Sequence, residues 1–432
     1  MNTHPNILII TTHDTGRHFG CYGHDTLHTP SVDSVAADGV RFSNYFATVP
    51  ICSASRATML TGQYPQTHGV MDLAFPGLGW PMREPRSHLS HVLRNAGYRT
   101  HLFGLQHEVA DTTILGFDEV HAERDEHRQR AAAANASERV AEMLESVSPG
   151  DAPFYAQVGF IETHTPFGAC GAPPDESCGV EVPPHLVEDA ESLAEMAAFQ
   201  GDVRAVDDAV GRIVDALKHS PFEENTILVI TTDHGIEVPR AKWTLYDPGI
   251  AIAMIMRWPA GGLSGGTVCD HLMANVDFLP TLLDLAGVDA PDDVEGVSFA
   301  GVLAQFGTPP PRDAVFSLYQ KFEVRAVRTE RFKLIQHFGF PTDFLHLPVA
   351  MDQVLQKRLV GMVELYDLEN DPREFTNIAD EPDYAEVRAD LSDRLWRWLE
   401  SVDDPILRGP TVTPSYRVAQ QDYLEWRSAS GR

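Results

Sequence analysis

Short apolar runs alternate with amphipathic segments through the first two-thirds of the chain. The runs Asn6–Thr12 and Thr226–Thr232 are nearly all apolar, which is typical of strands buried on both faces. Apolar residues recur at helical spacing over 192–217, so this segment predicts a long amphipathic helix. The alternation predicts an α/β fold, a mainly parallel sheet with helices on both sides. Further strands are expected at 98–103 and 154–160, and further helices at 29–39, 89–96 and 278–286.

The pattern changes after the Pro-rich stretch 308–312. Strand-like pieces follow it, and the chain then returns to helical spacing over 384–402. We therefore expect two domains, a catalytic α/β domain over 1–310 and a smaller C-terminal α+β subdomain over 311–432. The strand-like pieces of the second domain are 314–319, 325–328, 332–336 and 364–367.

The composition excludes some classes of partner. Hydrophobic residues make up 43% and charged residues 22%, the balance of a folded globular protein. The formal charge of −29 repels nucleic acid and anionic membranes, so neither is expected as a partner. The acidic, Lys-poor balance leads to the hypothesis of a high-salt cell interior, and a melting temperature that does not rise with salt would count against it.

The start of the chain and its cysteines bear on location. The first strand begins close to Met1 without a preceding basic segment, so the expectation is a cytoplasmic protein. The five cysteines do not form the pattern of a disulfide framework. Cys170 and Cys178 are expected to be two loop thiols, with a disulfide or a shared metal as the alternatives. The sequence indicates no particular oligomeric state.

Acidic and histidine residues follow three of the predicted strands. His13-Asp14 follows the first strand, Asp233-His234 follows the strand at 226–232, and His164 comes after the strand at 154–160. Each group alone is better explained by turn or helix-capping residues than by a metal site. In an open parallel sheet, however, the carboxyl ends of the strands meet at one edge. Two Asp/His pairs at one edge favour a shared divalent cation, for which carboxylates and imidazoles are suitable ligands.

The segment 50–62 places Cys52 and Arg56 in a loop that leads into a helix. A helix N-terminus and a nearby guanidinium both stabilise anions. A lone cysteine is commonly a small core residue. The small polar neighbours Ser53 and Ser55 favour a functional role here.

Cys52-Ser-Ala-Ser-Arg56 with Leu60-Thr61-Gly62 resembles the signature of the sulfatase family, Cys-x-Pro/Ala-x-Arg followed by Thr-Gly. The resemblance extends over nearly the whole chain. Thr12-His13-Asp14 and Gly104-Leu-Gln-His107 are most similar to the heparan N-sulfatase (sulfamidase) branch. The other segments that resemble family landmarks are 6–10, 29–44, 206–211, 276–282 and 364–368.

The resemblance implies the alkaline phosphatase-like fold and a sulfuric ester or sulfamate hydrolase. In sulfatases a maturation enzyme converts the signature cysteine to formylglycine, so Cys52 would be the precursor of the nucleophile. One hydroxyl of the hydrated aldehyde attacks sulfur, and the other expels sulfate by re-forming the aldehyde. A divalent metal ion neutralises charge on the sulfate oxygens. The resemblance implies a sulfated sugar as the substrate, and the net charge of −29 favours a small sulfated compound over a long polyanion.

The resemblance also assigns roles residue by residue. Asp14, Asp233 and His234 match metal ligands, and His13 stands where the family usually has an aspartate. That exchange would admit Mn²⁺ or Mg²⁺ beside the expected Ca²⁺. The remaining matches are Arg56, which would hold the nucleophile, His107 as its base, His164 as the group that contacts sulfate and assists the leaving group, and Lys242 as the sulfate-pairing lysine.

Two departures and two other interpretations accompany these assignments. Leu105 stands where many sulfatases have a second lysine, for which Gln106 or His107 would substitute, and Ala54 replaces the commoner proline. A phosphate or phosphonate ester hydrolase on the same scaffold is the second enzymatic interpretation. A non-catalytic anion-binding homologue with unmodified Cys52 is the third. Core packing or loop structure explains the other residues near the motifs better than a role in the substrate pocket does, namely His68, Trp80, Gln106, Glu108 and Trp243.

Overall fold

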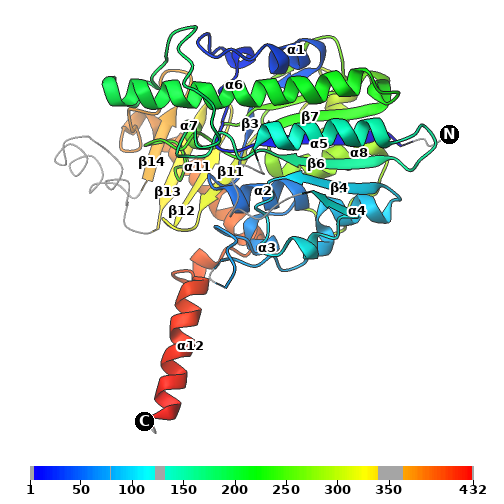
Figure 1. Cartoon of the computed structure of the whole chain (residues 1–432). Coiled ribbons are helices and arrows are strands. Elements are labelled where there is room, and N and C mark those ends of the chain that lie inside the picture. Colours follow the sequence, from blue (N-terminus) through cyan, green and yellow to red (C-terminus); the bar gives the residue numbers. More distant parts are fainter. Residues whose placement is uncertain (1–3, 78, 122–131, 339–362, 431–432) are drawn as a thin grey trace.

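The computed structural model describes residues 4–77, 79–121, 132–338 and 363–430 (Figure 1). Its centre is an eight-stranded sheet in the order β5-β4-β6-β1-β7-β8-β2-β9. The strands of this sheet are β1 (Asn6–Thr12), β2 (Val40–Phe42), β4 (Arg99–Gly104), β5 (Glu119–His121), β6 (Phe154–Gly159), β7 (Thr226–Thr232), β8 (Met254–Arg257) and β9 (Thr267–Cys269).

The sheet is mainly parallel, as predicted. Strands β5, β4, β6, β1 and β7 run parallel to one another, while β8 pairs antiparallel with both β7 and β2. β1 and β7 occupy central positions and are buried along their whole length, which explains their nearly continuous apolar sequences. A two-stranded parallel pair, β3 (Tyr45–Phe46) and β10 (Met273–Ala274), lies outside this sheet.

Helices cover both faces of the sheet, because alternate side chains of each strand point to opposite faces. Leu8 and Ile10 of β1 pack on the face covered by α1, α5 and α6, and Ile7 and Ile9 pack on the face covered by α2, α4 and α8. The long helix α6 runs across the molecule in Figure 1. The bounds are α1 (Pro30–Asp38), α2 (Cys52–Thr61), α3 (Pro65–His68), α4 (Leu89–Asn95), α5 (Ala133–Ser146), α6 (Ala190–Lys218), α7 (Asp247–Ile250), α8 (Phe278–Ala286) and α9 (Ala300–Ala304).

A second, antiparallel sheet follows in the order β11-β12-β13-β14. Helix α11 (Ala385–Ser401) packs on it through Leu391, Leu395 and Leu399. One cluster of buried side chains joins this region to the first part of the chain, so the boundary near residue 310 stays a prediction. The strands are β11 (Val315–Tyr319), β12 (Val324–Arg328), β13 (Phe332–His337) and β14 (Val363–Asp367).

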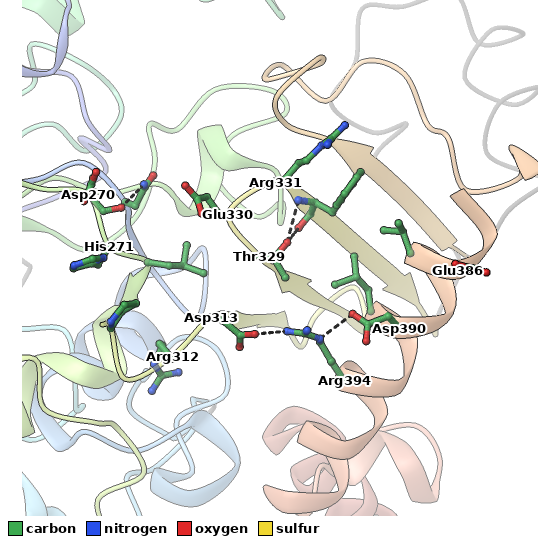
Figure 2. A pocket seen from close by; sticks show the side chains of 16 residues that line it. Asp270, His271, Arg312, Asp313, Thr329, Glu330, Arg331, Glu386, Asp390 and Arg394 are labelled. Atoms are coloured by element: carbon green, nitrogen blue, oxygen red, sulfur yellow. Dashed lines mark hydrogen bonds and ion pairs between the residues drawn. The ribbon is translucent and has the colours of Figure 1, made fainter. Parts of the chain in front are cut away.

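A cavity of about 830 Å³ lies where the C-terminal region meets the first part (Figure 2). Asp270 and His271 line it from the first part, and Arg394 of α11 lines it from the C-terminal region. Arg394 bonds Asp313 at 2.9 Å and Asp390 at 2.9 Å, so two carboxylates of the cavity wall share this one guanidinium.

The chain ends in a helix that the hydrophobic pattern does not predict, α12 (Pro414–Ala429). It projects away from the rest of the molecule, and it contributes no buried residue (Figure 1). Among the helices that the structure describes, none combines the length and the apolar composition that crossing a bilayer requires.

Candidate functional site

The register of two central strands brings the Asp/His pairs together. β1 and β7 are parallel neighbours in which Thr12 pairs with Thr232, so the residues that follow both strands leave the sheet side by side. The backbone N–H of Asp14 donates to Asp233 Oδ1 at 2.9 Å, which ties the two strand ends to each other. Asp14 has a φ of 53°, a left-handed conformation that Asp tolerates better than most residues.

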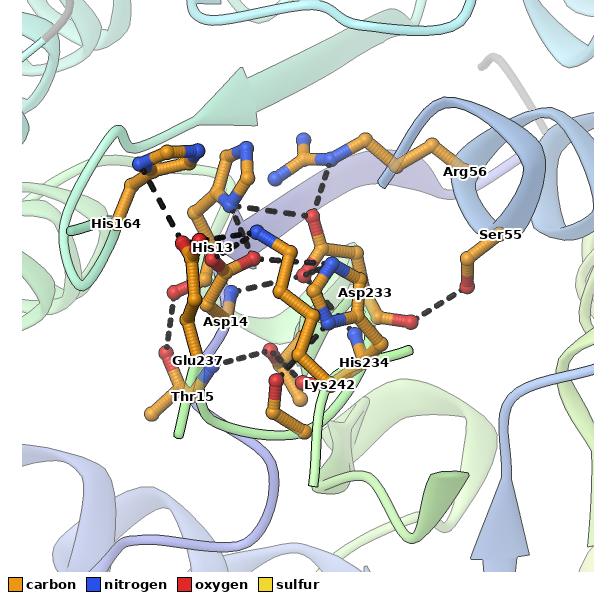
Figure 3. Close-up of polar contacts among 12 residues, drawn as sticks. His13, Asp14, Thr15, Ser55, Arg56, His164, Asp233, His234, Glu237 and Lys242 are labelled. Carbon is orange, nitrogen blue, oxygen red and sulfur yellow. Dashed lines mark hydrogen bonds and ion pairs between the residues drawn. The ribbon is translucent and has the colours of Figure 1, made fainter. Parts of the chain in front are cut away.

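Four side chains converge at this edge, and all are buried: His13, Asp14, Asp233 and His234 (Figure 3). Each offers a nitrogen or oxygen atom, and these atoms lie within 4.8 Å of one another. His13 Nδ1 lies 2.6 Å from Asp14 Oδ1 and 3.7 Å from Asp233 Oδ2. Two carboxylates and two imidazoles within this space form a mixed oxygen and nitrogen set that suits a divalent cation.

His234 gives a second reason to place a cation here. Its Nδ1 is engaged with the carbonyl of Gly235 at 2.9 Å, which directs Nε2 into the cluster. His234 Nε2 is 2.9 Å from Asp14 Oδ1, yet it makes no hydrogen bond of normal geometry to any described residue. A buried polar atom without a hydrogen bond is costly. An ion bound by Nε2 and Asp14 together would remove that cost.

Two cations hold the buried carboxylates. Arg56 Nε donates to Asp233 Oδ2 at 2.9 Å, and Lys242 Nζ donates to Asp14 Oδ2 at 2.6 Å. Burial alone would raise the pKa of Asp14, but His13, Lys242 and His234 hold it well below its usual value. Burial would lower the pKa of His234, but Asp233 and Asp14 raise it to about 10. The site therefore stabilises positive charge between the two carboxylates.

Cys52 is the first residue of α2, a helix whose ten residues are all buried. Its thiol lies in a second cluster with His13 and His107, with ligand atoms again within 4.8 Å of one another. Burial would raise the pKa of Cys52, but hydrogen bonds with His107, His13 and His234 hold it well below its usual value. A nucleophile derived from this residue would lie beside the metal cluster and at a helix N-terminus, which favours anions.

His107 is held by the loop that follows β4. Its ring Nδ1 lies 3.3 Å from His13 Nε2, and its backbone N–H donates to Glu108 Oε2 at 2.8 Å. Glu108 is fully buried and also accepts from Gln157 of β6 at 2.7 Å. Glu108 is therefore a positioning residue for the His107 loop, and it is one of the residues for which the sequence left core packing open.

His164 and Lys242 face each other across a glutamate that the sequence analysis does not single out. Glu237 Oε2 accepts from Lys242 Nζ at 3.0 Å and lies 3.8 Å from His164 Nδ1 (Figure 3). His164 remains partly exposed, whereas Lys242 is buried. Asp14, His164 and Glu237 form a further group whose ligand atoms lie within 4.8 Å. This side of the site is therefore its open, solvent-facing side.

Ser55 and Asn275 support the end of β7, and neither was predicted. Ser55 Oγ donates to the carbonyl of Asp233 at 2.5 Å, and Asn275 Nδ2 donates to Ser55 Oγ at 2.9 Å. Asn275 Oδ1 accepts from the backbone N–H of Thr48 at 3.0 Å. Asn275 follows β10 and stands just before the helix motif at 276–282, a position that carries no recognisable sequence signal of its own.

Several other residues named from the sequence have structural places. Leu105 is buried, and Gln106 donates to Val109 and Thr112 in its own loop, so its amide does not replace the missing lysine. His68 is buried and bonded to Thr58, while Trp80 packs against buried apolar clusters. Trp243 donates its backbone N–H to Pro50 at 3.1 Å. No disulfide joins Cys170 and Cys178, which agrees with the expectation of two loop thiols.

Comparison with known proteins agrees with this arrangement. Residues 5–288 match the sulfatase family model, and residues 240–401 match the model "N-sulphoglucosamine sulphohydrolase, C-terminal". An ulvan-active sulfatase of Formosa agariphila is 26% identical over 93% of this chain and 75% of its own length. The human N-sulphoglucosamine sulphohydrolase is 25% identical over 96% of this chain and 94% of its own length.

The fold also matches solved structures. One, a protein in complex with its substrate D-glucosamine-2-N,6-O-disulfate, superposes with a TM-score of 0.74 at 21% identity, over 94% of this chain and 99% of that one. At this identity the likeness concerns the fold. The first family model alone spans well over half of the 432 residues. The chain therefore belongs to the sulfatase family of hydrolases.

Proposed function

We propose that this sulfatase removes sulfate from a small sulfated sugar, with Cys52 as the precursor of a formylglycine nucleophile and one divalent cation beside it. The observation that carries the proposal is the shared position of His13 in two clusters, one with Cys52 and His107 and one with Asp14, Asp233 and His234. A nucleophile and a metal centre built around one histidine are the two parts that sulfate ester hydrolysis requires.

Each residue around Cys52 has a separate role in the proposed reaction. Arg56 holds Asp233 and closes the site behind the nucleophile. His107 lies where it can accept a proton from the group at position 52. Lys242 and the partly exposed His164 face the open side, where Lys242 would pair with sulfate oxygens and His164 would donate a proton to the leaving oxygen or nitrogen. The cation, held by His13, Asp14, Asp233 and His234, would neutralise charge on the sulfate.

Relatives support a sugar as the organic part of the substrate. The human relative is named for N-sulphoglucosamine, and the structural match was solved with a doubly sulfated glucosamine. The net charge of −29 disfavours a long polyanion lying across the surface. We therefore propose a sulfated monosaccharide or short oligosaccharide, including an N-sulfated one.

A side-by-side assay tests the reaction class. The protein is offered an aryl sulfate, an aryl phosphate, an aryl phosphonate and N-sulfoglucosamine after expression with a formylglycine-generating enzyme. We expect turnover of the sulfated compounds and a kcat/KM for phosphate and phosphonate esters that is lower by orders of magnitude. The opposite order would favour the phosphate or phosphonate ester hydrolase. Binding of all four without turnover, by protein shown to carry formylglycine, would favour the non-catalytic homologue.

Two further assays test the size of the substrate and the location of the protein. Turnover of an intact heparan-like polymer at the rate of its monosaccharide units would contradict the proposed small substrate. The cytoplasmic location stays a prediction, which fractionation of the native host cells checks.

A further inference from the structure

Three potential metal ligands lie on one face of the sheet edge formed by β4 and β5. In the parallel pairing of these strands, His101 is opposite Glu119 and Phe103 is opposite His121. Side chains two residues apart on a strand share a face, so His101, Glu119 and His121 project from the same side. The ring of Phe103 stacks on the ring of His121 with centroids 4.6 Å apart, which fixes the imidazole against the sheet.

The two imidazoles converge on one carboxylate oxygen of Glu119. Glu119 Oε2 lies 3.6 Å from His101 Nδ1 and 3.4 Å from His121 Nε2. One ligand atom from each of the three residues falls within a 4.8 Å group. These separations are longer than hydrogen bonds. They leave the space that an ion needs between the three atoms.

The other oxygen of Glu119 is already engaged. Arg99 donates to Glu119 Oε1 from Nε at 3.1 Å and from a terminal nitrogen at 2.5 Å. This pair orients the carboxylate and turns Oε2 toward the imidazoles. Metal-binding carboxylates are commonly oriented by such an outer hydrogen-bonding partner.

The burial of His101 is a second, independent observation that points to a metal site. The residue is only 4% exposed, and its Nδ1 has no hydrogen-bond partner among the described residues. A buried imidazole nitrogen that faces a carboxylate oxygen without bonding it is the arrangement expected of two ligands that lack their ion.

We propose that His101, Glu119 and His121 bind a Zn²⁺ ion, separate from the catalytic cation. Two imidazoles and one carboxylate are a frequent ligand set for zinc and leave a fourth position for water or a further ligand. Ca²⁺ is a poorer match for a site with a single carboxylate and two imidazoles, because it favours several oxygen ligands. A surface hollow of about 640 Å³ between this edge and α5 gives the ion a path from solvent. α5 packs against β4.

The bound ion would fasten the edge of the sheet. β5 has only three residues and pairs with the rest of the sheet through β4 alone. Glu119 and His121 come from β5 and His101 comes from β4, so the ion would cross-link the two strands. Binding that occurs only in the folded state raises the stability of that state.

Zinc uptake by variants tests the proposal. The full chain is stripped with a chelator, supplied with excess Ca²⁺ and titrated with Zn²⁺ by calorimetry, and bound zinc is counted after gel filtration. We expect each wild-type chain to retain one more Zn²⁺ ion than a chain of either His121→Gln or Glu119→Gln. Affinity at this site should fall by more than the roughly 10- to 100-fold that loss of an outer partner costs. His219→Gln is the matched control, because His219 is an exposed histidine that follows the last residue of α6 and lies near Asp215, and this variant should retain the wild-type number.

Two readouts separate this site from the catalytic centre and from misfolding. Absorption spectra are recorded with Co²⁺ in place of Zn²⁺. Subtraction of the His121→Gln spectrum from the wild-type spectrum should leave the absorption bands of a four-coordinate ion. Metal-free melting temperatures of wild type and both variants should agree, and added Zn²⁺ should raise only those of wild type and His219→Gln. Equal zinc counts in wild type and either ligand variant would overturn the proposal, as would a wild type that gains no ion.

Discussion

Arg56 Nε donates a 2.9 Å hydrogen bond to Asp233 Oδ2, which joins the helix that begins at Cys52 to the end of the central strand β7. A terminal nitrogen of the same guanidinium donates to the carbonyl of Thr12 at 3.1 Å, at the end of β1. One buried side chain thus fixes the position of the nucleophile relative to both strands that carry the metal ligands.

Replacement of Arg56 should therefore affect both stability and activity. We expect Arg56→Ala to lower the free energy of unfolding by about 3–5 kcal/mol, because the buried carboxylate of Asp233 loses its ion-pair partner. Arg56→Lys keeps the charge but loses the fork that reaches both strands, and misplacement of the nucleophile should lower kcat/KM by roughly 10²-fold. Urea unfolding and steady-state kinetics measure the two effects. Arg204→Ala, which breaks a half-exposed ion pair with Asp175, is the control and should cost about 1 kcal/mol or less.

The second prediction concerns His13 and the choice of metal. Chelation should abolish activity, and because His13 adds an imidazole to the oxygen ligands, Mn²⁺ and Mg²⁺ should restore activity beside Ca²⁺. His13→Asp returns a carboxylate to this position and should narrow reactivation toward Ca²⁺. Activity of chelator-treated protein across a series of added metals checks this. An unchanged metal profile in His13→Asp would show that His13 is not a ligand.

Glu237 should weaken the binding of an anionic substrate. Its carboxylate lies 3.0 Å from Lys242 Nζ, so it competes with sulfate for the same ammonium group. Charges a few ångströms apart interact by about 1 kcal/mol even in water, so Glu237→Gln should lower KM by roughly fivefold. Glu181→Gln, at an exposed pair with His24, is the control and should leave KM unchanged. A raised KM in Glu237→Gln would instead indicate that Glu237 contacts the substrate directly.

Acid should destabilise the protein through His68. The imidazole accepts from the backbone N–H of Val70 at Nδ1 and lies 3.0 Å from the Thr58 hydroxyl at Nε2, so only the neutral ring fits. Burial lowers its pKa to about 3. The folded state stays neutral while the unfolded chain takes up a proton below about pH 6.5, so stability is lost as pH falls through that value.

The expected loss from His68 alone is about 1.4 kcal/mol at pH 5.5 relative to pH 7.5. Urea unfolding at the two pH values measures it. In His68→Gln, whose amide can make the same two hydrogen bonds, the difference between the two pH values should shrink by that amount. The same slope in both proteins would mean that His68 is protonated in the folded state.

The positions of the site residues that follow β1 and β7 were predictable, because short apolar runs in the sequence identify these two strands. Nearly continuous apolar runs identify β1 and β7, and a parallel sheet then places Asp14 and Asp233 at one edge without further information. Glu237 and Asn275 were not predictable, because loop and turn geometry alone brings them to the site.

Three elements, α5, β5 and α12, escaped the pattern for physical reasons. The first half of the buried face of α5 consists of small residues such as Ala133 and Ala136, which give a weak periodic signal. β5 has three residues with no wholly buried position, so nothing in the sequence shows that Glu119 lies opposite His101. α12 exposes Tyr423, Leu424 and Trp426, and solvent exposure of such residues is contrary to the usual pattern.

The group at position 52 decides the mechanism. Cys52→Ala should be inactive, and protein made without a maturation enzyme should bind substrate without multiple turnover, because a thiolate that took the sulfate would have no built-in way to release it. Cys52→Ser should be trapped or very slow unless the host also oxidises serine. Single-turnover and steady-state assays on the same preparations check these outcomes.

The most direct test is the mass of the peptide that contains Cys52, measured on active protein from the native host and compared with its turnover number. We predict that the residue has lost the elements of hydrogen sulfide and gained one oxygen, the composition of formylglycine, and that turnover rises in proportion to the modified fraction. Repeated turnover by protein that carries only the free thiol would contradict this account and would indicate a different nucleophile, such as a metal-bound water.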